Sequence, residues 1–348
     1  MILKYKNLLT ATICMCFITC LLTFPSSGTQ GVIQGLNLCY KIIVPSLFPF
    51  SVAALLISDA NLLSPILKKA EKFTKKIFRL NSAETTIYLL SLFGGYPVGA
   101  KLVQKAYLDK KISTKKAEKM LGFCVNSGPS FIIIAVGAGI MGRKDLGFAL
   151  FFSSLISSVI LAIFLRCKDL SLQTKHNETK SICFSDKLVE STYNATEAML
   201  NICGFVVLFS AVIELLNSIL PKNQITTFCL SFLEISNSVS SNGKDVFLVA
   251  FMLGFGGFCV HFQVLSMCKG LKINYLLFLL YRTVHGLLNI LFAFIIMKIF
   301  KICIPTAIAS NISQIKTSEI SVFFALVLMT AAIVFISSTE KIIKKCRN

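Results

Sequence analysis

The sequence predicts an all-α polytopic membrane protein with two structural repeats, broken helices and re-entrant hairpins. Hydrophobic residues make up 55% of the 348 residues and charged residues only 15%, whereas charged residues are ~25% of a soluble domain. Several apolar stretches are close to the ~20 residues that a helix needs to cross a bilayer. Glycine pairs interrupt two shorter apolar stretches, although glycine weakens a simple membrane helix.

The apolar stretches give the order of the membrane segments. We expect crossings near these ranges: 7–24, 31–58, 120–140, 146–165, 199–220, 273–299 and 319–338. The shorter stretches that contain the glycine pairs are 85–100 and 246–268. With the N-terminus inside, the seven crossings would leave the basic C-terminal tail outside, against the positive-inside rule. We therefore expect one further crossing within 225–268.

The net charge of +19 is that of a membrane protein with basic ends to its spans, and we do not expect nucleic acid as a partner. Basic clusters lie at 68–79 and 101–119, on both sides of the first glycine pair. If both clusters are cytoplasmic, residues 83–100 enter the membrane and return, so that Gly94, Gly95 and Pro97 form the tip of a re-entrant hairpin. The alternative is an ordinary span kinked at Pro97.

The residue types that support catalysis or metal binding lack the necessary spacing. The thirteen cysteines lie mostly within apolar runs, where a free cysteine behaves as a small hydrophobe. The histidines, His176, His261 and His285, are scattered and lack metal-ligand spacing. The chain has no nucleophile motif or phosphate-binding loop. We expect no metal, no cofactor and no enzymatic activity.

An internal repeat divides the chain. The segment LFGGYPVGAKLVQ (92–104) aligns with GFGGFCVHFQVLS (254–266), and FPFSVAALL (48–56) aligns with VLFSAVIEL (207–215) at nearly the same separation. Paired glycine-interrupted segments in two halves are typical of a transporter binding site. The resulting divisions are an N-terminal membrane segment (1–30), a first membrane repeat (31–165), a polar linker (166–198), a second membrane repeat (199–340) and a basic tail (341–348).

A second break is expected at Asn126, Ser127, Gly128 and Pro129, within the apolar stretch 120–140. Pro129 lacks an N–H, so the carbonyl four residues earlier, on Val125, loses its helical partner. Pro129 also suits the start of a new half-helix, whose free N–H groups would attract an anion. The alternative is a kinked structural span.

The stretch YRTVHGLLN places Arg282, His285 and Asn289 on one helical face. An arginine at this depth costs ~2.5–3.5 kcal/mol on insertion scales, so it should face the interior of the bundle. There it would bind a carboxylate with His285 beside it, or else form a structural ion pair with Glu214 or Glu234.

Four motifs carry a resemblance to a known family: PSLFPF (45–50), GGYPVGAK (94–101), KKAEKML (115–121) and FCVNSGPSFI (123–132). In this order they resemble the sporulation integral membrane proteins of the YlbJ type, which carry the nucleoside-recognition, or Gate, domain. The resemblance covers roughly 30–165 well, and the second half chiefly through GFGGF. It implies that both repeats are Gate-like.

The resemblance further implies a multi-pass protein of the mother-cell membrane around the forespore, which transports dipicolinate, a small aromatic dicarboxylate, toward the spore. We therefore expect a transporter or facilitator of a small organic anion, with the lipid bilayer and other sporulation membrane proteins as further partners. The alternatives are a non-transporting scaffold of a sporulation complex and a nucleoside transporter. The residues expected to bind substrate are Gly94, Gly95, Tyr96, Pro97, Lys101, Asn126, Ser127, Gly256, Gly257, His261, Gln263, Arg282 and His285.

Overall fold

The structure is a computed structural model that describes residues 2–59, 63–166, 184–221, 223–236, 239 and 245–302. Within these ranges the regular elements are helices and there is no strand. The expected crossing at 319–338 and the tail at 341–348 lie outside the described residues. The predicted all-α fold is confirmed.

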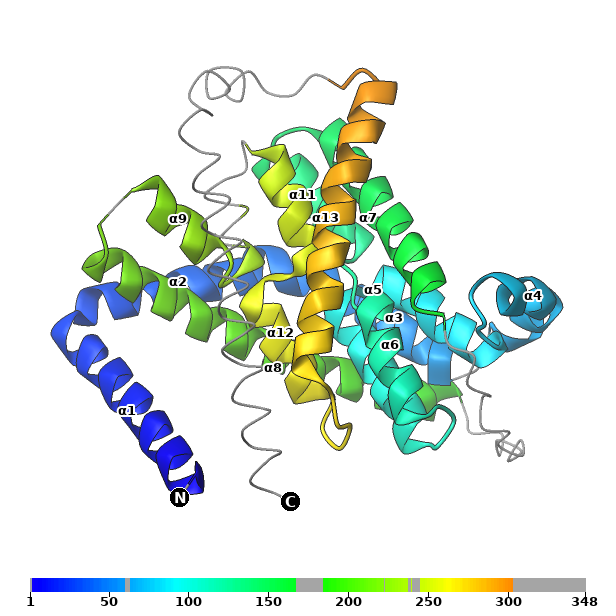
Figure 1. Cartoon of the computed structure of the whole chain (residues 1–348), viewed down its shortest axis with the longest axis horizontal. Helices are drawn as coiled ribbons and strands as arrows, with labels where there is room; N and C mark the ends of the chain where they lie inside the picture. The colour runs from blue at the N-terminus through cyan, green and yellow to red at the C-terminus, as the bar shows by residue number, and fades with distance from the viewer. Residues whose placement is uncertain are drawn as a thin grey trace.

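The helices follow one another in the order shown in Figure 1. Their bounds are α1 (Ile2–Thr23), α2 (Pro25–Leu38), the π-helix η1 (Cys39–Ile43), α3 (Val44–Asp59), α4 (Ser64–Ile77), α5 (Ser82–Leu108), α6 (Thr114–Cys124), the π-helix η2 (Ser130–Ile140), α7 (Lys144–Phe164), α8 (Phe184–Ile219), α9 (Gln224–Ser231), α11 (Val246–Phe255), α12 (Gly257–Met267) and α13 (Tyr275–Ile299).

Within the described part of the chain, six helical stretches are long and apolar enough to cross a membrane. They are Pro25–Ser58, Ser82–Leu108, Lys144–Phe164, Phe184–Ile219, Val246–Met267 and Tyr275–Ile299. The protein is therefore a multi-pass membrane protein. The stretch Val246–Met267 lies within 225–268, where the charge rule required one more crossing.

Two groups of helices are each closely packed. The helices α2 and α3 lie along α8, while α13 lies between α7 and α11 (Figure 1). Glycines allow close approach at both contacts: a Cβ on Gly31 of α2 would lie 2.6 Å from the Ala211 Cα of α8, and one on Gly254 of α11 would lie 2.6 Å from the Gly286 Cα of α13. Small residues at such contacts let membrane helices pack backbone against backbone.

A buried ion pair joins α5 to α6. The Lys116 Nζ lies 2.6 Å from the Glu84 Oε1, and the two side chains are 5% and 2% exposed. Glu84 also closes a capping box with Asn81 at the start of α5, since each backbone N–H donates to the other's side chain at 2.8 Å. The entry to α5 is thus fixed by charge and by capping together.

Two expected segments differ from the structure. The stretch 120–140 is not one crossing, because α6 ends at Cys124 and η2 begins at Ser130. Residues 184–198, expected in a polar linker, form the first part of α8. Their buried small side chains, Ser191, Ala195 and Ala198, recur at helical spacing and give this part of α8 a packing face despite its polarity.

Candidate functional site

The helices are interrupted at three places: within α5, between α6 and η2, and between α11 and α12. Gly95 has φ 81° and ψ −179°, so α5 consists of two helical halves. Residues 125–128 are not helical. Gly256 and Gly257 have φ of 92° and 72°. Left-handed backbone of this kind is open to glycine and strained for other residues, which explains why Gly95, Gly256 and Gly257 are glycines.

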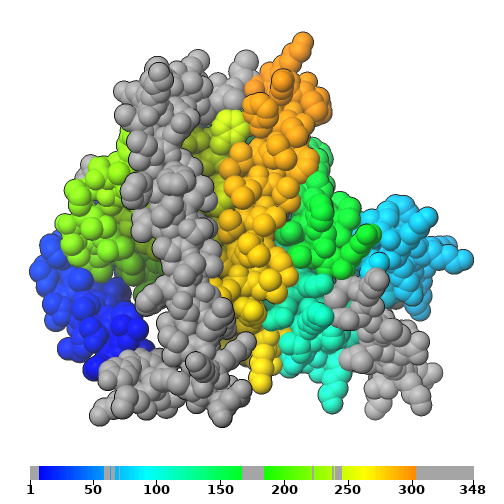
Figure 2. All heavy atoms as spheres, in the orientation of Figure 1, coloured from blue at the N-terminus to red at the C-terminus, as the bar shows by residue number. Residues whose placement is uncertain are grey.

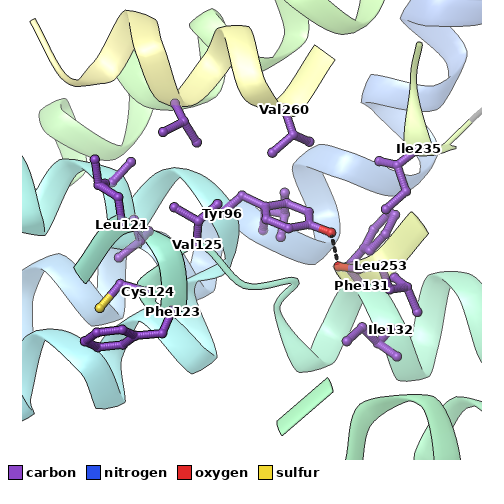
Figure 3. Close-up of a cluster of buried hydrophobic side chains, with 14 of the residues drawn as sticks. Tyr96, Leu121, Phe123, Cys124, Val125, Phe131, Ile132, Ile235, Leu253 and Val260 are labelled. Carbon is purple, nitrogen blue, oxygen red and sulfur yellow. Dashed lines mark hydrogen bonds between the residues drawn. The ribbon is translucent and has the colours of Figure 1, made fainter. Parts of the chain in front are cut away.

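The C-terminal end of α11 is where the three interruptions meet. A helix leaves its last carbonyls without intrahelical partners, and here side chains from other elements donate to them. The Tyr96 hydroxyl of α5 donates to the Leu253 carbonyl at 2.7 Å, as Figure 3 shows. Ser127, from the interruption after α6, donates to the Tyr96 hydroxyl and lies 3.3 Å from the same carbonyl.

Arg282 of α13 binds two of the remaining carbonyls of α11. Its Nη2 donates to Gly254 and its Nε donates to Phe255 at 3.3 Å. Its Nη1 donates to the Val125 carbonyl, and its Cζ lies 5.9 Å from the centre of the Tyr96 ring. A cation at a helix C-terminus is stabilised by the helix dipole. The guanidinium therefore joins α13 to the interrupted ends of α6 and α11.

The contacts of Arg282 differ from the structural ion pair that the sequence suggested. Among the described residues, no salt bridge joins Arg282 to Glu214 or Glu234; its hydrogen bonds to carbonyl groups take that place. The Val125 carbonyl had been expected to lack its helical partner because of Pro129, and the structure supplies Arg282 as that partner. Pro129 stands at the start of η2 with helical φ and ψ of −59° and −37°.

Both histidines of the site are held by donors and acceptors that fix their tautomers. The Arg282 Nη1 lies 3.0 Å from the His285 Nδ1, and since arginine only donates, this nitrogen accepts. The proton of neutral His285 is then on Nε2, which faces the Ser154 carbonyl at 3.5 Å. In the same way the His261 Nε2 donates to the Phe255 carbonyl at 3.0 Å, and its Nδ1 lies 3.3 Å from the Tyr275 hydroxyl.

Asn289 belongs to the site, although the sequence placed it only on the same face as Arg282. Its Nδ2 donates to the Ala250 carbonyl at 2.8 Å, and its Oδ1 accepts from Ser153 at 2.6 Å. Ser153 and Ser154 were missed. The signal that points to them is the series of serines at helical spacing in α7, since small polar residues in membrane helices mark packed faces.

These contacts define a central polar cluster, whose members are Tyr96, Ser127, His261, Arg282, His285 and Asn289. Tyr96 is 6% exposed and the other members are 3% exposed or less. Apolar side chains lie around the Tyr96 side chain, including Val125, Phe131 and Val260 (Figure 3). Charge and polarity are therefore concentrated in the buried interior.

The start of η2 lies beside this cluster and has no side-chain cap. A Cβ on Gly95 would lie 3.7 Å from the Gly128 backbone nitrogen, so two interruptions are in contact here. Asn126 donates its Nδ2 to the Phe123 carbonyl at 2.7 Å, and within the described residues its buried Oδ1 has no hydrogen-bond partner. A buried polar atom without a partner is unfavourable, so a group that donates to this oxygen would be stabilised.

Four other residues that were expected to bind substrate are not members of the central polar cluster. Lys101 is outside the cluster, because its Nζ is 3.0 Å from the Glu197 Oε2 and donates to the Asn194 carbonyl of α8 at 3.0 Å. Gln263 is buried but donates to the Cys259 sulfur at 3.3 Å. Gly94 and Pro97 flank the Gly95 interruption and are buried in α5. Within the described residues, no three side chains of histidine, cysteine, aspartate or glutamate gather as a metal site would require.

The chain is similar to the "Sporulation integral membrane protein YlbJ" of Bacillus subtilis (strain 168). The two are 23% identical over 342 residues, which covers 85% of this chain and 84% of that protein. No family model and no solved structure matches the chain. The similarity extends through both halves and confirms the resemblance to the YlbJ type, while the Gate domain and the internal repeat stay predictions.

Proposed function

Because the chain is a homologue of a YlbJ-type sporulation integral membrane protein, we propose that it is a transporter or facilitator of a small organic anion. The proposed substrate is dipicolinate, carried across the mother-cell membrane toward the forespore. The observation that carries the proposal is the meeting of three helix interruptions, from both halves of the chain, in one buried polar cluster.

Broken helices at a buried interface between two halves are the usual construction of a transporter site. The central polar cluster has this construction, since the halves are joined there by hydrogen bonds from Tyr96 and Ser127 to α11 and from Arg282 to Val125. A site that opens alternately to either side requires bonds between the halves that can form and break. A contact between helices with a purely structural role would not need interrupted helices in both halves of the chain.

The anion would bind at the start of η2. The N–H groups at a helix N-terminus attract an anion, and this end has no side-chain cap. The Arg282 guanidinium already donates to three carbonyls. It would therefore attract the anion by its positive charge rather than by direct hydrogen bonds to a carboxylate. The Tyr96 ring would offer a flat surface to an aromatic substrate, and Asn126 Oδ1 an acceptor for a protonated group.

Substrate entry would require movement, because the cluster is closed to solvent. The halves would separate where Tyr96 and Ser127 are hydrogen-bonded to the Leu253 carbonyl. The same hydrogen bonds would form again when the site closes. Nothing in this arrangement forms an activated nucleophile, so we propose that the protein performs no covalent chemistry.

Uptake into proteoliposomes tests the proposal. Purified full-length protein should take up labelled dipicolinate, and unlabelled dipicolinate should compete better than benzoate or uridine. Strong competition by uridine would favour nucleoside transport instead. Absence of uptake by the wild-type protein in both orientations would favour the scaffold alternative.

A matched pair of variants locates the site. Tyr96→Phe removes the hydroxyl that links Ser127 to Leu253, and should lower the uptake rate about tenfold, as the loss of one hydrogen bond permits. Tyr88→Phe removes another buried hydroxyl from α5, which lies 3.2 Å from the Ser158 Oγ, and should leave uptake near the wild-type rate. Equal effects of the two variants would place the site elsewhere.

A further inference from the structure

The helix α4 carries a basic face. Its lysines, Lys68, Lys69, Lys72, Lys75 and Lys76, recur at helical spacing and are all exposed. Within the described residues, the ion pair on this helix joins the Lys75 Nζ to the Glu71 Oε1 at 2.6 Å. The charges of the other four lysines on this face would suit an acidic partner.

The opposite side of α4 is attached to the protein. Thr74 is buried and its hydroxyl lies 3.2 Å from the Leu80 carbonyl. The Phe78 ring lies 6.0 Å from the Tyr88 ring of α5. Phe73 is the exception, because it is 64% exposed and stands at the border of the lysine face. An exposed aromatic side chain beside lysines is typical of a helix that lies in a membrane interface.

The position of α4 in the chain keeps it near the bilayer. It lies between two stretches that are long and apolar enough to cross a membrane, Pro25–Ser58 and Ser82–Leu108, and the connections to both are short. Lysine is strongly disfavoured in the hydrocarbon region, so the helix must lie at the surface. Figure 2 shows α4 (light blue) at the edge of the molecule, projecting from the helical bundle.

We propose that α4 is a binding surface for anionic lipid headgroups of the adjacent leaflet. Its lysines would contact the phosphates while Phe73 enters the boundary with the acyl chains. Each lysine near an anionic membrane adds to the attraction, and the charge of the whole chain has the same sign. An acidic protein would complement the lysines equally well, but it would not place Phe73 among acyl chains. The proposal is independent of what the protein transports.

The chain contains no tryptophan, so one introduced tryptophan reports on a single position. The full-length Phe73→Trp protein is reconstituted into vesicles with equal mole fractions of phosphatidylglycerol and phosphatidylcholine, one of which carries bromine on its acyl chains. We expect brominated phosphatidylglycerol to quench about threefold more than brominated phosphatidylcholine, and 0.5 M salt to reduce this difference, as screening requires (roughly 3–4 Å Debye length). The control is Phe294→Trp on α13, at a side chain that is 50% exposed, where the two lipids should quench equally.

Charge-neutralised variants test the lysines themselves. Replacing Lys68, Lys69, Lys72 and Lys76 by glutamine should remove the preference at position 73. The same replacement of Lys110, Lys111, Lys115 and Lys119 should leave it unchanged. Equal quenching by the two lipids in the Phe73→Trp protein would overturn the proposal, and quenching by neither would favour a protein partner instead.

A second measurement needs no reporter. Phosphatidylglycerol added to detergent-solubilised wild-type protein should raise the melting temperature by several degrees more than phosphatidylcholine does. The variant with four neutralised lysines on α4 should lose most of this difference. The same rise in the variant as in the wild type would overturn the proposal even if the tryptophan protein does not fold.

Discussion

The guanidinium of Arg282 donates a hydrogen bond to the backbone carbonyl of Val125, although the two residues belong to different halves of the chain. Val125 follows the last residue of α6, and its carbonyl lacks a helical partner because Pro129 has no N–H to offer. One side chain of α13 thus completes an end of α6 while it caps α11. The following predictions test this arrangement and the packing around it.

Arg282→Met should strongly destabilise the protein. The substitution leaves the carbonyls of Val125, Gly254 and Phe255 without their donor in the buried interior, and we expect the free energy of unfolding to fall by about 3 kcal/mol or more. Thermal unfolding in detergent measures the loss. The control is Arg143→Met, which removes a partly exposed pair with Asp145 and should change stability by less than about 1 kcal/mol. Similar melting temperatures for both variants would contradict the role of Arg282 as a cap.

Gly254→Ala should destabilise the contact between α11 and α13. The added methyl group would lie 2.6 Å from the Gly286 Cα, so the helices must separate, at a cost of about 1–3 kcal/mol. Gly204→Ala in α8 has open space around the new methyl group and should be neutral or stabilising by ~0.5–1 kcal/mol. If thermal unfolding gives the opposite order, the two helices do not approach each other through these glycines.

Replacing one member of the Glu84–Lys116 ion pair should destabilise the protein more than replacing both members. Glu84→Gln keeps a side chain able to close the capping box, but it leaves the Lys116 charge buried alone, and we expect a loss of ~3–5 kcal/mol. Lys116→Gln should have a similar effect. The double variant should lose clearly less free energy of unfolding than the two single variants lose together. A double-mutant cycle measures this difference. Additive losses would mean that the two charges do not interact.

Cys268 should react slowly with thiol reagents in the folded protein. Burial raises the pKa of its thiol to about 12, so almost none is thiolate at pH 8, and the rate should rise with pH until the pKa is approached. Maleimide labelling followed by peptide mass spectrometry should find Cys268 modified only after unfolding, while the exposed Cys229 reacts in the folded state. Labelling of Cys268 as fast as Cys229 at pH 8 would be the contrary result.

The sequence was informative where one residue type has one physical consequence. Pro129 predicted the unpartnered carbonyl of Val125, the glycine pairs predicted interruptions of the helices, and the spacing of Arg282 and His285 predicted an inward-facing pair. In each case the constraint is local, since it follows from a missing N–H, a missing Cβ or the helical repeat.

The partners in the central polar cluster were not predictable in the same way. Arg282 was expected to need a carboxylate, because a sequence displays charged side chains but does not display which backbone carbonyls the fold brings within reach of a given side chain. Lys101 was assigned to the site from its closeness to Gly95 in the chain, whereas the helix carries it toward Glu197 on α8. Both sets of contacts come from packing between distant segments, which only the folded chain specifies.

The order of synthesis fits the position of Arg282. Each carbonyl that it binds, on Val125, Gly254 and Phe255, precedes it in the chain, so the acceptors are made before the donor. When α13 leaves the ribosome, α6 and α11 are already complete, and an arginine that would cost ~2.5–3.5 kcal/mol to insert alone has its partners ready. A chain that carried the arginine in an earlier helix would have to hold that charge unpaired until the later helices arrived.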